Sequence, residues 1–234
     1  MPGSESVHKR INKFLAETGT CSRRGADALI TSGKVTINGE TAVLGSIVND
    51  GDVVAVDGKI VSAVDDKIYM AFNKPLGITC TTDRRDPSNI IDYINYPERI
   101  FPIGRLDKNS SGLILLTNNG DIVNKLLRAE NNHEKEYIVS VDKPLAGDFK
   151  KQMEGGLPIL GQITLPCEVE VLGSRRFSIT LHQGLNRQIR RMCEYLGYRV
   201  IKLRRVRFMN IKLGALKTGE YRILTKEEIR GLLD

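Results

Sequence analysis

The spacing of apolar positions over the first 60 residues predicts two short helices followed by short strands. Residues 10–18 place their apolar side chains on one helical face, and a second helix is predicted between a Ser22 cap and Gly33. Apolar alternation at 35–37 and 53–56 then leads into Asn-Gly and Asp-Gly pairs, which are strong hairpin signals. We therefore expect a compact N-terminal module of two helices and a few short strands.

From residue 68 onward the chain is rich in predicted strands. Apolar runs and alternations predict strands at 68–72, 78–82, 101–106, 113–117, 134–141, 159–165, 167–172, 177–181, 198–208 and 221–224. Helices are predicted at 89–95, 121–128, 145–153, 186–196 and after Thr225, which forms a capping box with Glu228. Because the strands pair as hairpins without regular βαβ alternation, we expect an α+β fold with a mainly antiparallel mixed sheet flanked by helices.

The polar segment 62–67 separates these two patterns. Three of its residues are charged, a composition typical of a linker. The sequence therefore predicts two domains, at 1–67 and 68–234.

One carboxylate, Asp107, lies in a short polar segment between two predicted strands. The segment 107–112 is rich in Asp, Asn, Ser and Gly, which form turns by hydrogen-bonding to their own backbone. A carboxylate held between two core strands is rigidly placed, as a reacting group must be. From local chemistry alone, a turn-capping Asp107 and a reactive Asp107 both stay open.

Positive charge is concentrated in one segment of the chain. The net charge is +7, and residues 187–212 alone carry nine Lys or Arg against one Glu. The first 67 residues, by contrast, carry eight Lys or Arg against nine Asp or Glu. A dense block of one sign within a folded pattern favours a polyanionic partner, and nucleic acid is the first candidate.

Composition excludes several classes of protein. No apolar run is long enough for a membrane span, and the N-terminus has no apolar signal-peptide core. The four cysteines form no Cys-x-x-Cys pair and have no histidine near them in sequence, so we expect no metal site and free thiols in a reducing cytoplasm.

Two further segments carry candidate chemistry. Helical spacing places Arg187, Arg190 and Arg191 on one face of the predicted helix 186–196, and arginine is well suited to forked contacts with phosphate. The predicted strand at 198–208 adds five more cations, so the two segments together are expected to form an RNA-facing wall. Tyr137 either packs at the edge of the sheet or stacks on an extruded base.

Three motifs, in this order, resemble those of pseudouridine synthases of the RsuA/RluF type. They are GRLDKNSSGL from Gly104, KEY ending at Tyr137, and GLNRQIRRM from Gly184. The segments 133–137 and 158–161 are most similar to the RluF subtype, which acts on large-subunit rRNA.

The resemblance covers nearly the whole chain. Residues 8–60 resemble the small RNA-binding module named after a ribosomal small-subunit protein, the S-four fold, and residues 74–77 resemble the strand–turn segment of the synthases.

The resemblance implies a role for each matching residue. Asp107 matches the catalytic aspartate, Tyr137 matches the tyrosine that stacks on the target base, and Arg190 matches the basic residue that pairs with the aspartate. Ile189 and Leu203 match apolar positions around the active site. Cations expected to contact RNA are Arg105, Arg187, Arg191, Lys202, Arg204, Arg205 and Arg207, with Arg10, Lys13, Arg23 and Arg24 in the N-terminal module.

The implied activity is isomerisation of a uridine in structured RNA, such as a large-subunit rRNA stem-loop. The target base must be flipped out of its helix at a cost of roughly a few kcal/mol. The ribose–uracil bond breaks, the base turns, and it is rejoined through carbon, so no cofactor is expected. We expect a monomer without a membrane partner. Members of the subtype can carry a long basic tail, and any contribution from such a tail is expected to be absent from a chain that ends at Asp234.

Two other functions use parts of the same pattern. A catalytically silent RNA-binding or ribosome-assembly protein needs the basic segment but has no use for Asp107 opposite Arg190. A glycoside hydrolase normally needs two cooperating carboxylates, and the Asp107 motif offers no obvious second one.

Overall fold

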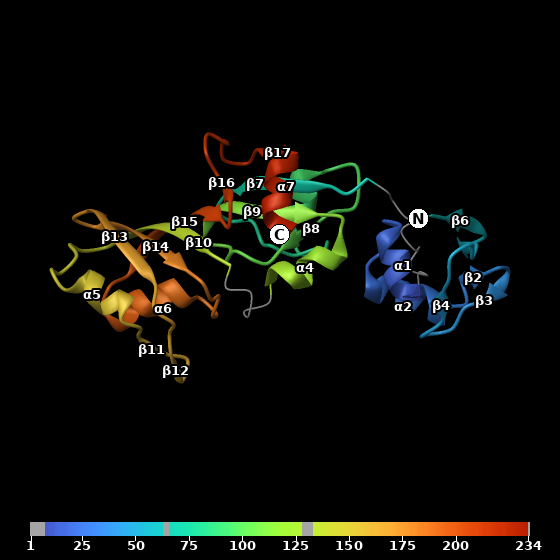
Figure 1. Ribbon diagram of the computed structural model, residues 1–234, viewed down its shortest axis with the longest axis horizontal. Helices are drawn as coiled ribbons and strands as arrows, with labels where there is room; N and C mark the ends of the chain where they lie inside the picture. Colours follow the sequence, from blue (N-terminus) through green and yellow to red (C-terminus); the bar gives the residue numbers. More distant parts are fainter. Residues whose placement is uncertain (1–7, 63–65, 128–132, 234) are drawn as a thin grey trace, which may run out of the picture. The chain divides into compact units, whose positions relative to one another are not determined.

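The computed structural model describes residues 8–62, 66–127 and 133–233 (Figure 1). The chain folds as two compact units, the first formed by Met1–Lys67 with Pro97–Arg99, and the second by Ile68–Tyr96 with Ile100–Asp234. Part of the predicted linker at 62–67, residues 63–65, lies outside the described residues.

The first unit packs two helices, α1 (Ile11–Glu17) and α2 (Arg23–Thr31), with short strands. The Ser22 hydroxyl accepts a hydrogen bond from the Gly25 amide at 3.0 Å, so the predicted cap of α2 is confirmed. The strands are β1 (Lys9–Arg10), β2 (Val35–Ile37), β3 (Glu40–Thr41), β4 (Ile47–Val48), β5 (Val54–Val56) and β6 (Lys59–Val61).

Both predicted hairpins of this unit are present. Strands β2 and β3 are joined through Asn38 and Gly39, with φ of 52° and 86°, and β5 and β6 through Asp57 and Gly58, with φ of 48° and 76°. Two consecutive residues with positive φ form the tight turn whose twist matches the flanking strands.

The second unit is built on a nine-stranded sheet, counted over the described residues, with the order β13-β14-β10-β15-β9-β7-β17 and with β16 and β8 pairing β15 and β9. Its strands are β7 (Tyr69–Lys74), β8 (Phe101–Ile103), β9 (Ser111–Thr117), β10 (Lys135–Val141), β13 (Glu168–Gly173), β14 (Arg176–Leu181), β15 (Val200–Phe208), β16 (Ile211–Lys212) and β17 (Tyr221–Ile223). Only β15 and β9 pair in parallel, and the remaining ladders of this sheet are antiparallel. The predicted α+β class is confirmed.

The centre of the sheet is buried on both faces. Along β9, Leu113 and Leu115 pack into one apolar cluster with helices α4 (Gly120–Leu127) and α7 (Lys226–Leu233). Ile114 and Leu116 point to the opposite cluster, which contains α3 (Ile90–Ile94). Burial on both faces explains why this strand is a continuous apolar run.

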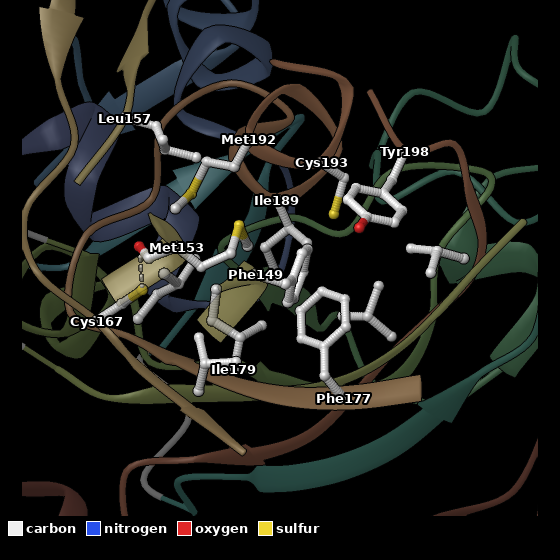
Figure 2. Packing of buried hydrophobic residues seen from close by; sticks show 14 of the residues in the cluster. Phe149, Met153, Leu157, Cys167, Phe177, Ile179, Ile189, Met192, Cys193 and Tyr198 are labelled. Atoms are coloured by element: carbon white, nitrogen blue, oxygen red, sulfur yellow. Dashed lines mark hydrogen bonds between the residues drawn. The ribbon is translucent and has the colours of Figure 1, made fainter. Parts of the chain in front are cut away.

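A separate apolar cluster forms where β10, β13 and β14 meet α5 (Phe149–Glu154) and α6 (Gln188–Tyr195) (Figure 2). Phe149 is at its centre, with ring centroids 4.9 Å from Phe177 and 5.1 Å from Tyr198. Ile189, Met192 and Cys193 point from α6 into this cluster, as the helical spacing predicts. The arginine-bearing face of α6 is therefore fixed by the packing of its opposite face.

Three predicted elements differ from the structure. Residues 78–82 form no strand, residues 159–165 form a small hairpin of β11 (Pro158–Ile159) and β12 (Gln162–Ile163), and α5 begins only at Phe149. The hairpin turns through Leu160 and Gly161, both with positive φ, a turn that an apolar run does not reveal. Arg128, the last residue of a predicted helix, lies outside the described residues.

No helix in the described ranges is long and apolar enough to cross a membrane.

Candidate active site

Asp107 lies in a tight loop, residues 104–110, between the antiparallel strands β8 and β9. The Ser110 amide donates to the Asp107 carbonyl at 2.9 Å and closes the turn. The loop is also anchored from outside, because the Leu106 amide donates to Cys80 Sγ at 3.3 Å and the Gly77 amide donates to the Lys108 carbonyl at 2.9 Å. The backbone around Asp107 is therefore held on both sides, as predicted for a fixed carboxylate.

Lys74 is the buried cation beneath this loop. Its ammonium is fully buried and donates to the carbonyl oxygens of Pro75 at 2.9 Å and Ile78 at 2.7 Å. Burial lowers the pKa of Lys74, and the nearby Cys80 and Asp107 oppose that shift. The Lys74 contacts hold residues 75–78 as a turn, which accounts for the absence of the strand predicted at 78–82.

Gly112 permits strand β15 to approach the end of the Asp107 loop. Its φ is +101°, and a Cβ atom added there would overlap the Arg205 carbonyl oxygen and lie 2.8 Å from the Arg205 amide nitrogen. Gly112 and Arg205 are partners in the parallel β9–β15 ladder. A side chain at this position would therefore force apart the strand that follows Asp107 and the strand that carries Arg205.

Arg190 reaches the same loop from helix α6. Its Nη2 donates to the Asn109 carbonyl at 2.7 Å and to Ser110 Oγ at 3.3 Å. Within the described residues no ion pair joins Arg190 to Asp107; Arg190 instead contacts the loop beside it, with the carboxylate as an electrostatic neighbour. Burial lowers the pKa of Arg190, and Asp107 opposes that shift.

A β-bulge between β10 and β15 sets the side chains opposite the Asp107 loop. Tyr137 pairs with Arg205, and Lys135 pairs with Phe208, with a register shift between the two pairs. The extra residue on β15 is Val206, and it changes the alternation so that Arg205 and Phe208, three positions apart, face the same side. The bulge thus brings Tyr137, Lys135, Arg205 and Phe208 onto one face.

These elements enclose a cavity of about 620 Å³. The predicted site residues that line it include Arg105, Asp107, Tyr137, Ile189, Leu203 and Arg205. Arg187 lines it too, in a left-handed conformation with φ of 51°, which is uncommon for a residue other than Gly, Asn or Asp. The volume lies within the range of small-molecule sites and suffices for a nucleotide.

The structure divides the predicted basic wall. Lys202 and Arg204 on β15 are exposed, whereas Arg205 is only 4% exposed and lines the cavity. Arg207 is paired with Glu134 at 2.6 Å and with Glu136 at 2.9 Å. Among the three arginines of β15, Arg204 is therefore the one that is exposed and that, within the described residues, neither lines the cavity nor forms an ion pair.

The predicted cap of α6 and one predicted cation of the first unit also differ from expectation. Asn186 does not cap α6, because its backbone and side-chain oxygens accept from Arg191 at 3.1 and 3.2 Å. In the first unit Arg10, Arg23 and Arg24 are exposed, whereas Lys13 is half-buried and pairs with Glu17 at 3.7 Å.

Comparison with known proteins agrees with this geometry. The family model described as RNA pseudouridylate synthase matches residues 68–195, and an S4 domain model matches residues 9–54. The dual-specificity RNA pseudouridine synthase RluF of Salmonella typhi is 54% identical over 94% of this chain and 77% of its own length. The chain belongs to the RNA pseudouridine synthase family.

Two more members of the RNA pseudouridine synthase family extend the match. The ribosomal large subunit pseudouridine synthase B of Bacillus subtilis is 36% identical over 96% of this chain and 95% of its own length. A crystal structure of a pseudouridylate synthase superposes with a TM-score of 0.71 at 30% identity, covering 95% of this chain and 99% of that one. Isomerase activity and an RNA-binding S4 domain follow from these matches.

Residues at or beside the cavity that were not singled out from the sequence include Lys74, Gly112, Lys135 and Phe208. Lys74 and Gly112 lie inside quoted motifs, where a lysine before a Pro-Leu-Gly turn and a glycine ahead of a buried strand were available signals. Lys135 lies inside the KEY motif, two positions before Tyr137 and on the same face of β10, whereas Phe208 reaches the site through the β15 bulge, which leaves no mark in the sequence.

Proposed function

We propose that this chain isomerises a uridine of large-subunit rRNA to pseudouridine in the cavity around Asp107, after the base is flipped out of its helix. The observation that carries the proposal is that Asp107, from the loop between β8 and β9, and Tyr137, from strand β10, line one cavity of about 620 Å³ together with several cations. The RluF and large-subunit relatives support the substrate class.

Asp107 is the group that acts on the sugar. In the reaction the N1–C1′ bond breaks, the uracil turns, and a C5–C1′ bond forms; a proton leaves C5 and N1 gains one, so the product is an isomer of the substrate. The Asp107 carboxylate has no hydrogen bond in the described part of the chain, which leaves its oxygens available to the substrate. Direct attack on C1′ and assistance of elimination are both compatible with this placement.

Tyr137 is assigned as the stacking platform for the flipped base. Flipping costs roughly a few kcal/mol, and stacking on an aromatic ring offsets about 1–3 kcal/mol of it per base. Tyr137 pairs with Arg205 in the β10–β15 ladder, and its ring lines the cavity together with Ile189 and Leu203. We also assign to Tyr137 the removal of the proton from C5.

Arg190 is a positioning residue in this proposal. It donates hydrogen bonds to the Asn109 carbonyl and the Ser110 hydroxyl, and Asp107 is its electrostatic neighbour, so it fixes the loop that carries the carboxylate.

The surrounding cations are assigned to RNA phosphates. Arg105 and Arg187 line the cavity, and Arg191 lies on helix α6. Lys202 and Arg204 extend the basic surface along β15. We propose the division at 1–67 and 68–234 as an S4 RNA-binding domain and a catalytic domain. In the first domain, Arg10, Lys13, Arg23 and Arg24 guide substrate choice.

We assign the reaction to a monomer in the cytoplasm. The four cysteines are free thiols, as in reducing compartments.

The test is complementation of a strain that lacks the gene. Pseudouridine would be mapped in large-subunit rRNA from cells that express the wild type, Asp107→Asn or no protein. We expect one site or a few sites to be modified only with the wild type, while Asp107→Asn binds rRNA and leaves those sites as uridine. Full modification by Asp107→Asn would refute the role of Asp107, and identical rRNA in all three strains would favour a silent RNA-binding protein.

A further inference from the structure

Arg205 has hydrogen-bond donors that no group in the described part of the protein uses. It is 4% exposed, and its Nε donates to the Leu113 carbonyl at 2.6 Å. Over the described ranges neither terminal nitrogen of its guanidinium has a hydrogen-bond or ion-pair partner, although Arg205 lines the cavity. These donors are therefore available to a ligand in the cavity, and a hydrogen bond from a charged donor is among the stronger ones.

The surroundings of Arg205 are cationic and aromatic. Its guanidinium carbon lies 5.8 Å from the centroid of the Phe208 ring, and Lys135 Nζ lies 5.8 Å from the same centroid. Lys135 donates to the His133 carbonyl at 2.9 Å. The guanidinium of Arg205 and the ammonium of Lys135 can donate hydrogen bonds but cannot accept them, so both favour an acceptor on a bound group.

Arg205 is next to the two groups assigned to catalysis. It is the ladder partner of Tyr137, and directly opposite residues of an antiparallel pair have Cα atoms about 4.5–5.5 Å apart. It also acts electrostatically on the Cys80 thiol, which accepts a hydrogen bond from Leu106, the neighbour of Asp107. A base stacked on Tyr137 within reach of Asp107 has Arg205 at its edge.

We propose that Arg205 recognises the target base, because its free guanidinium donors bind a carbonyl oxygen of the flipped uracil. They bind one carbonyl oxygen before the base turns and the other carbonyl oxygen afterwards. This inference rests on the proposed function of the cavity.

The symmetry of uracil makes a donor-only group suitable for a reaction in which the base turns. Rotation about the N3–C6 axis exchanges N1 with C5 and exchanges O2 with O4. An arginine placed against one carbonyl therefore finds an acceptor in both orientations. Cytosine has an amino group in place of O4, so in one orientation it would present a donor to a donor, and this mismatch selects for uracil.

The test replaces each carbonyl oxygen by sulfur, which is a weak acceptor. The probe is an RNA stem-loop copied from the rRNA segment mapped above, with uridine, 2-thiouridine or 4-thiouridine at the target position. Single-turnover conversion would be followed by nucleoside chromatography. For the wild type we expect each sulfur substitution to lower kcat/KM about 5-fold or more, since a hydrogen bond to a charged donor contributes about 10- to 100-fold.

Arg205→Met removes the donors and keeps an apolar side chain of similar length, and Arg204→Met is the matched control on the exposed side of the same strand. Arg205→Met should convert the uridine RNA about 10- to 100-fold more slowly and should no longer distinguish uridine from either thiouridine. Arg204→Met should keep the wild-type ratio of uridine to thiouridine rates. Circular dichroism would establish that both variants are folded.

Equal rates of the wild type on all three RNAs would overturn the proposal, and this comparison needs no mutant. A thiouridine effect that persists in folded Arg205→Met would overturn it too, because the contact would then belong to another group. Absence of pseudouridine from the unsubstituted RNA would instead overturn the proposed function, and this inference with it.

Discussion

Replacing Gly112 by alanine is expected to damage the fold and the active site together. Gly112 has a φ of +101°, which side-chain-bearing residues rarely adopt, and its missing Cβ leaves room for the backbone of Arg205. An alanine methyl would overlap the Arg205 carbonyl oxygen, lie 2.8 Å from the Arg205 nitrogen and lie 3.0 Å from Arg204 Cγ. Two of the three clashing atoms are backbone atoms in a paired strand, so relief requires β15 to move.

Two contributions determine how much stability Gly112→Ala loses. An unfavourable φ costs about 1–2 kcal/mol, and overpacking that forces a backbone shift costs about 1–3 kcal/mol. We therefore expect Gly112→Ala to lower the free energy of unfolding by about 2–5 kcal/mol. Because β15 carries Leu203 and Arg205 to the cavity, a shift of about 1 Å should also lower kcat/KM about 100-fold.

Gly161→Ala is the matched control. Gly161 also has a positive φ, +74°, but a Cβ there would meet no atom within 4 Å, so only the backbone cost of about 1–2 kcal/mol applies. Both variants would be unfolded in urea and followed by circular dichroism, since the chain has no tryptophan. A Gly112→Ala protein as stable and as active as Gly161→Ala would refute the close approach of β9 and β15.

Three further outcomes follow from the described contacts. Thr225→Ala should cost about 1 kcal/mol of unfolding free energy, because the Thr225 hydroxyl accepts from the Glu228 amide at 3.2 Å at the start of α7; unchanged urea unfolding would contradict this. Arg207 lowers the pKa of Glu134, so the pair should stabilise the fold above the carboxyl's unfolded pKa of roughly 4.3, and the contribution should be lost as the pH falls through the lowered folded value. Because the Glu134 side chain is 44% exposed, we expect Glu134→Gln to cost about 0.5 kcal/mol at pH 7 and progressively less as the pH falls, and a cost that does not change with pH would contradict the pairing. The double variant Lys202→Gln and Arg204→Gln should reduce the slope of log RNA affinity against log salt concentration by about 1.4–1.8, whereas Arg207→Gln, which removes an ion-paired arginine, should leave the slope unchanged. A slope changed by Arg207→Gln but not by the double variant would contradict the assignment of Lys202 and Arg204 to RNA.

The sequence predicts best where local chemistry and burial agree. The apolar run after Asp107 becomes β9 because it is buried on both faces, and the loop before it holds a carboxylate between two strands as expected. The capping box at Thr225 forms in both directions, at 2.9 and 3.2 Å. These signals need only neighbouring residues to be satisfied.

Features that depend on distant backbone were predicted less well. Residues 78–82 have the composition of a strand, but the buried Lys74 ammonium donates a hydrogen bond to the Ile78 carbonyl and stabilises a turn there. The cations of β15 read as one basic wall, whereas Arg205 is buried and Arg207 is neutralised by Glu134 and Glu136. Strand alternation separates Arg204 from Arg205, and the bulge at Val206 then brings Phe208 to the side of Arg205.

The central claim is that the cavity around Asp107 carries out the isomerisation. It is tested most directly with RNA that bears tritium at C5 of its uridines, because formation of the C5–C1′ bond releases that tritium to water. We expect the wild type to release one tritium for each target uridine, and Asp107→Asn to release it at least ~10⁴-fold more slowly while binding the RNA equally well. Tritium release by Asp107→Asn at the wild-type rate would contradict the account.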